Sequence, residues 1–127
     1  MAIGTAFALV FLAQASPAAI PAPATPFDVG YPELVEGENA AAAKAIEACE
    51  ELDSDDPARL INHGIALARM GRFTEARADF EAAAKADNSV ELETASGTWV
   101  DSRHLARRAL ASLERGEFQR YYAMSMR

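Results

Sequence analysis

Side chains suited to chemistry are few in this sequence. It contains two histidines, His63 and His104, and a single cysteine, Cys49. No further ligand residue stands at metal-binding spacing from either histidine, and one cysteine cannot form an internal disulfide. We expect His63 to be partly buried on a helix face, His104 to be exposed, and Cys49 to be buried as a small hydrophobic residue. These residues predict no metal site and no cofactor.

Known catalytic patterns are missing as well. The sequence has no glycine-rich phosphate loop, no nucleophile elbow and no His-Glu-x-x-His motif. The acidic run at 50–56, EELDSDD, lacks the alternation and the central glycine of a calcium-binding loop. We interpret this run as solvated helix ends. Since no acid–base or nucleophile constellation is visible, we expect that the protein is not an enzyme.

Composition and charge limit the partners. The chain has 127 residues, of which 50% are hydrophobic and 24% charged, as expected of one small globular or repeat domain. A net charge of −7 argues against nucleic acid or an anionic membrane as the main partner. Residues 28–56 carry ten acids and one lysine, whereas residues 101–127 carry three acids and six arginines. This asymmetry reflects ordinary solvation, head-to-tail association of copies, or a partner that bridges the two poles.

The beginning of the sequence looks like a targeting segment. Residues 2–13, AIGTAFALVFLA, are uncharged and too short to span a bilayer of roughly 30 Å comfortably. The small-x-small sequence ending at Ala15 predicts a signal peptide over 1–15 and a periplasmic or secreted protein, with no membrane span after cleavage. No Lys or Arg precedes the apolar run, so an uncleaved anchor is the alternative. Residues 16–29 are rich in proline and alanine and predict an extended linker.

A period of 34 residues organises the remaining chain. Gly30 and Gly64 are 34 residues apart, and so are Gly37 and Gly71. A repeat of this length with small residues at matched positions indicates paired helices that stack one unit on the next. We therefore predict an all-α fold for residues 30–127, an array of antiparallel helix hairpins with about two and a half repeats.

The clearest unit covers residues 56–88. Asp56 and Pro57 predict the start of a helix at 57–70, and Gly71 predicts its end. A second helix is expected at 74–86. A partial unit at 30–53 precedes this one, with helices at 32–36 and 39–52, and a third unit at 102–127 follows it. The third unit has a helix at 102–115, capped by Asp101 or Ser102, and a short last helix that contains Phe118, Tyr121 and Tyr122.

The full unit resembles the tetratricopeptide repeat. The resemblance is carried by Leu60, Gly64, Leu67, Gly71, Phe73, Ala76, Phe80, Ala83 and Asp87. His63 stands where the family usually has leucine, and Asn88 where it often has proline. Tyr121 stands where the family has alanine, so the last helix is expected to pack differently, as a terminal cap.

Residues 89–100, SVELETASGTWV, form an insertion before the third unit. Residues 90–93 alternate, Ser96 and Gly97 predict a turn, and residues 98–100 are β-prone, so a short hairpin or an irregular loop is expected. Trp99 is the one tryptophan of the chain. It either closes an open edge of the helical core or forms one wall of a peptide-binding groove. Long insertions in regular arrays are often functional.

The resemblance implies recognition of a protein or peptide on a concave face lined by the first helices of the repeats. In the full unit the implied partner-binding residues are Ile61, Asn62, Ile65, Ala68 and Arg69. In the third unit they are Arg103, Ala106, Arg107, Leu110 and Leu113, and Trp99 joins them. An aliphatic floor with an arginine rim favours a partly apolar, acidic peptide.

Asn62 is similar to the asparagine of the carboxylate clamp in chaperone-binding members of the family. Ile61 and Ile65 are apolar where that clamp is polar, so the clamp specificity is not expected here. The predicted function is a non-catalytic protein-interaction module of the bacterial cell envelope. One alternative is a self-assembling structural unit that forms homo-oligomers, because about two and a half repeats is marginal for a solenoid and the exposed ends can pair between copies. A small enzyme is the less favoured alternative.

Overall fold

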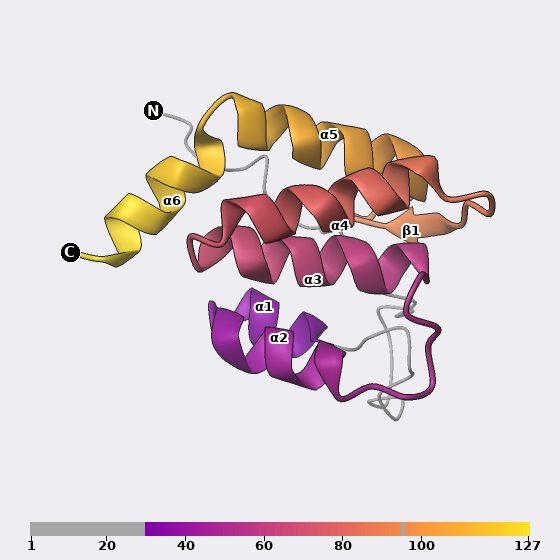
Figure 1. Cartoon of the computed structure of the whole chain (residues 1–127), viewed down its shortest axis with the longest axis horizontal. Coiled ribbons are helices and arrows are strands. Elements are labelled where there is room, and N and C mark those ends of the chain that lie inside the picture. The colour runs from indigo at the N-terminus through magenta and orange to yellow at the C-terminus, as the bar shows by residue number, and fades with distance from the viewer. Residues whose placement is uncertain (1–29, 95) are drawn as a thin grey trace.

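The computed structural model describes residues 30–94 and 96–127, so the predicted signal peptide and the linker lie outside the described residues. Helices dominate the described part, which confirms the all-α class, and a small two-stranded sheet is added to them (Figure 1). The helices are α1 (Tyr31–Val35), α2 (Asn39–Glu47), α3 (Pro57–Arg69), α4 (Phe73–Lys85), α5 (Ser102–Glu114) and α6 (Glu117–Ser125). The strands are β1 (Glu91–Glu93) and β2 (Trp99–Asp101).

Aspartate side chains cap the starts of helices α3 and α5, as the sequence predicts. The side chain of Asp56 accepts a hydrogen bond of 3.0 Å from the backbone N–H of Arg59 at the start of α3. The side chain of Asp101 accepts bonds of 2.8 and 3.3 Å from the N–H groups of Arg103 and His104 in α5. These bonds satisfy amides that have no partner within the helix. Asp101, and not Ser102, is therefore the cap of α5.

Helices α3 and α4 form a closely packed hairpin. Each lies within one residue of its predicted bounds. Gly71 joins them with a φ of +83°, a conformation that glycine adopts without strain. A Cβ atom on Gly64 would lie only 2.5 Å from Cε1 of Phe80, so the missing side chain is what lets the Phe80 ring rest against α3. This contact between a small residue and a large one sets the spacing of the pair.

Helix α2 is shorter than predicted. The predicted helix 39–52 ends at Glu47, and the chain continues as an irregular segment to α3. Nη1 of Arg59 holds this irregular segment against the start of α3, because it donates to the carbonyl oxygens of Cys49 at 2.7 Å and Leu52 at 2.8 Å. The acidic run that follows is also unfavourable at a helix C-terminus, where the helix dipole is negative. The prediction for residues 48–52 was therefore wrong.

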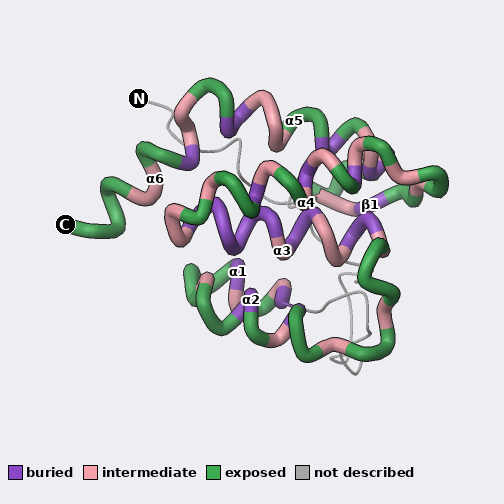
Figure 2. Tube along the Cα trace, viewed as in Figure 1, coloured by how far each residue is buried: buried purple, intermediate pink, exposed green. Residues whose placement is uncertain are grey.

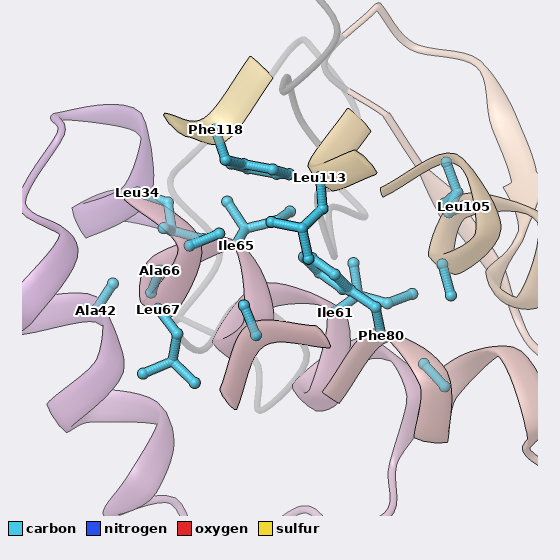
Figure 3. Close-up of a cluster of buried hydrophobic side chains, with 14 of the residues drawn as sticks. Leu34, Ala42, Ile61, Ile65, Ala66, Leu67, Phe80, Leu105, Leu113 and Phe118 are labelled. Carbon is cyan, nitrogen blue, oxygen red and sulfur yellow. The ribbon is translucent and has the colours of Figure 1, made fainter. Parts of the chain in front are cut away.

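The last helix is attached through aromatic contacts. Phe118 is almost fully buried and stacks on Phe80 with 6.0 Å between ring centroids. Figure 3 shows its ring above Ile65 of α3. Further along α6, the hydroxyl of Tyr121 accepts a 3.3 Å hydrogen bond from Nδ2 of Asn39 in α2. Helix α6 therefore contacts the full unit and reaches back to the first, so it closes one edge of the array.

Helix α3 lies at the centre of the core. It contacts α2, α4, α5 and α6, and Figure 2 shows buried positions along its whole length. The buried cluster draws on every helix and on β1, and its largest members are Phe80, Phe118, Ile61, Leu67 and Leu113. None of the described helices is long and apolar enough to cross a membrane.

Candidate functional site

The face of α3 that the sequence assigned to a partner is buried. Ile61, Asn62, Ile65 and Ala68 are almost wholly inaccessible. Ile61 and Ile65 belong to the same hydrophobic cluster as Leu113 of α5 and Phe118 of α6. These α3 residues are therefore part of the core and present no surface for a peptide, which corrects their placement as a groove floor. The sequence did not show this because the closing contact comes from a helix about 50 residues downstream.

Arg69 is also buried and makes contacts within the fold. It is 9% exposed, and its Nη1 donates a 2.9 Å hydrogen bond to the carbonyl oxygen of Leu34 in α1. Its guanidinium lies 5.2 Å from the centroid of the Tyr121 ring. Burial lowers the pKa of Arg69, although the group remains cationic. Arg69 joins α1, α3 and α6, and the prediction that it forms an accessible rim was wrong.

Asn62 is the second buried polar residue of the predicted α3 set. Its side chain is fully inaccessible, and neither Oδ1 nor Nδ2 has a hydrogen-bond partner within the described part of the chain. An unsatisfied buried amide destabilises a fold by about 1 to 3 kcal/mol. Asn62 is therefore enclosed in the core and is not accessible to a peptide.

The predicted residues of α5 are divided between core and surface. Ala106 and Leu113 are buried, and Leu110 is partly buried against the core. Arg103 is partly buried, and its Nη2 donates to the carbonyl oxygen of Asp87 at 3.2 Å. Arg107 is exposed. Of the predicted set, only Arg107 and Trp99 thus present most of their side chains to solvent.

The insertion folds as an antiparallel hairpin. Leu92 pairs with Val100, and Glu93 pairs with Trp99. The turn is closed by bonds of 2.8 Å from the N–H of Thr94 to the carbonyl of residue 98 and from the N–H of residue 97 to the carbonyl of Thr94. The second strand extends one residue beyond the predicted insertion, to Asp101. The structure therefore decides between the two expectations for residues 89–100 in favour of a hairpin.

The two faces of the hairpin differ because side chains alternate along a strand. Leu92 is 6% exposed and Val100 packs against the core, so this pair closes the edge of the helical array. Trp99, one residue away, is 54% exposed and lies on the opposite face. Trp99 therefore does not close the core, and it does not border the buried face of α3.

Carboxylates surround Trp99 on the outer face. The register places Glu93 directly opposite Trp99 and Glu91 opposite Asp101, so all four side chains share this face. Asp101 is engaged in capping α5, and hydrogen bonds, first that from Ser89, lower its pKa. Glu91 is exposed and Glu93 is partly exposed. Among the described residues, no cationic side chain lies over the Trp99 ring.

The hairpin is held firmly on the helices. Strand β2 runs directly into α5, and the N–H of Ser102 donates to the carbonyl of Val90 at 2.9 Å. The Ser102 hydroxyl in turn accepts a 3.1 Å bond from the N–H of Val90. The backbone of Trp99 is thus held in one conformation before any partner binds, which lowers the conformational entropy lost on binding.

A second polar cluster joins α2, α3 and α4. Nδ1 of His63 is 2.6 Å from Oδ2 of Asp79, and its Nε2 is 3.8 Å from Oε1 of Glu47. A cavity of about 170 Å³ adjoins this cluster and is also lined by Ser54 and Arg59. The Nε2 atom is buried, and Arg59 is occupied with two backbone carbonyls. These groups link α2, α3 and α4 with the segment that precedes α3.

Metal-ligating side chains and the thiol of Cys49 provide no further candidate site among the described residues. Within residues 30–94 and 96–127, no three His, Cys, Asp or Glu side chains gather as a metal site would require. Cys49 is partly exposed, not buried as expected, and its Sγ lies 3.3 Å from Oε2 of Glu51. The exposed outer face of the hairpin is therefore the candidate functional site.

Comparison with known protein families, with curated proteins and with solved structures finds no match for this chain. The tetratricopeptide resemblance therefore depends on the residues themselves. Glu91 and Glu93 were not predicted as site residues. The alternation at 90–93 and the turn at Ser96 could have predicted them, because a hairpin with this turn places both glutamates and Trp99 on one face of the sheet.

Proposed function

We propose that this protein is a non-catalytic protein-interaction module, a small tetratricopeptide-like array that presents an inserted β-hairpin to its partner. The observation that carries the proposal is Trp99, a large aromatic side chain that is 54% exposed on a firmly mounted hairpin. Tryptophan is enriched among the residues that dominate binding energy at protein interfaces.

Two features of the helices support an array of this kind. α3 and α4 each have 13 residues and meet through the small position Gly64, and α5 then packs on α4 as the first helix of a next unit would. Helix α6 departs from a regular stack, because it contacts both α3 and α5. We assign the protein to the bacterial envelope from the apolar segment and small-x-small sequence that end at Ala15.

An affinity-capture experiment tests the proposal. The purified protein and its Trp99→Ala variant are immobilised and exposed to envelope extract of the source cells. We expect a partner that binds the wild type and is lost with Trp99→Ala. The matched control is Met126→Ala, which removes an apolar side chain that is 70% exposed just after the far helix α6 and should leave binding intact. Equal capture by all three proteins would contradict the proposal.

A further inference from the structure

Trp99 and the carboxylates beside it make a surface with a definite chemistry. The indole offers a negative π face, and Glu91 and Glu93 add two carboxylates on the same side of the hairpin. Aromatic faces bind ammonium and guanidinium groups, with tryptophan the strongest of the three aromatic residues. Neighbouring carboxylates reinforce the attraction for cations and repel anions.

We propose that this outer face of the hairpin docks a basic segment of a partner protein, with an arginine or lysine side chain lying on Trp99 and its charged head directed to Glu91 and Glu93. The inference rests on the proposed function and specifies its partner. It departs from the acidic peptide expected from the sequence, because the groove that would have bound that peptide is buried.

The charge around the site favours this occupant over an acidic or neutral one. Glu91 has no cationic partner, and Glu93 none either, among the ion pairs of the described residues. Both carboxylates are therefore available to a ligand. The apolar stem of an arginine or lysine can cover the indole while its head remains hydrated. A single arginine or lysine side chain of the partner can therefore contact both the exposed Trp99 ring and an exposed carboxylate.

The chain itself allows a direct measurement, since Trp99 is its one tryptophan and its fluorescence reports on the site alone. We would titrate the full protein with a six-residue peptide that contains three arginines and no aromatic residue, and with a glutamate peptide of the same length. We expect saturable quenching by the arginine peptide, weaker in high salt, and no response to the glutamate peptide.

Two matched charge variants test the geometry. Glu91→Gln/Glu93→Gln should raise the Kd of the arginine peptide about tenfold. Glu36→Gln/Glu38→Gln removes the same charge from exposed residues at the other end of the array and should leave the Kd unchanged. Calorimetry on Trp99→Leu, which keeps an apolar side chain but loses the indole, should show binding about fivefold weaker. Circular dichroism verifies that each variant is folded.

Four results would overturn the inference. The first is an equal loss of affinity for the arginine peptide in the two charge variants, and the second is a glutamate peptide that binds as tightly as the arginine peptide. The third is free arginine that binds as tightly as the arginine peptide. The fourth is Trp99 fluorescence that changes with protein concentration when no peptide is present. The last would make a second copy the occupant. If capture of a partner still depends on Trp99 while the arginine peptide fails, the proposed function stands and only the partner's chemistry is wrong.

Discussion

The imidazole of His63 and the carboxylate of Asp79 are sixteen residues apart in the chain and form a 2.6 Å contact between Nδ1 and Oδ2. This contact joins α3 to α4, and Glu47 of α2 lies on the other side of the ring. The hydrogen bond with Asp79 is the largest cause of a raised His63 pKa, to which the charges of Asp79 and Glu47 add, against the opposing effect of burial. His63 therefore links three helices, and the link is strongest when its ring is protonated.

Stability should depend on pH through His63. Because its pKa is higher in the folded than in the unfolded protein, its stabilising contribution is complete below about pH 6.5, the unfolded value, and is lost as pH rises through the folded pKa. We expect His63→Gln to lower the free energy of unfolding by about 1 kcal/mol more at pH 6 than at pH 9, measured by urea denaturation. His104→Gln, at the exposed histidine, is the control and should show no such difference.

Gly64→Ala should destabilise the protein although alanine is the better helix former. The new Cβ would lie 2.5 and 2.8 Å from two carbons of the Phe80 ring, which is fully buried and cannot move freely. We expect a loss of about 1 to 3 kcal/mol in the free energy of unfolding, more than the gain of about 1 kcal/mol from helix propensity. Adding Phe80→Leu should recover part of the loss, and a more stable single variant would contradict the close packing.

The attachment of α6 depends on Phe118. Phe118→Ala should reduce the free energy of unfolding by about 3 to 5 kcal/mol, because it leaves a cavity above α3 and removes the stacking contact with Phe80. Met124→Ala changes the same helix at a side chain that is 57% exposed and should cost less than about 0.5 kcal/mol. Thermal and urea unfolding followed by circular dichroism compare the two. Equal effects would mean that α6 is not docked through its aromatic face.

Two arginines predicted for one binding surface should behave differently. Arg69→Met deprives the Leu34 carbonyl of its donor and should lower the free energy of unfolding by about 1 to 3 kcal/mol. Arg107→Met alters an exposed side chain and should change stability by less than about 0.5 kcal/mol. Denaturant midpoints measure both. A similar small effect at the two positions would show that Arg69 does not tie α1 to the array.

Local signals predicted most of the elements correctly. Asp56 and Gly71 determine the ends of α3 through a side-chain cap and a positive φ, both of which depend on residues within one turn. The end of α2 was missed because the segment after Glu47 is held in an irregular path by a residue outside it, Arg59, which lies ten residues beyond Cys49 and bonds to its carbonyl oxygen. The sequence pattern of residues 48–52 does not indicate such a contact, because the contacting residue lies outside that segment.

The sequence by itself determined the helical class, the caps, the turns and the pairing of α3 with α4, because these follow from short-range geometry and from the apolar spacing along each helix. Only the tertiary structure decided which surfaces remain open. The α3 face carrying Ile61 and Ile65 is apolar whether it binds a peptide or the core, and its burial with Phe118 follows from the docking of α6. Exposure of Trp99 likewise depends on the strand register that turns Leu92 and Val100 inward. Burial is a property of the assembled chain, since it depends on which distant segment covers each face.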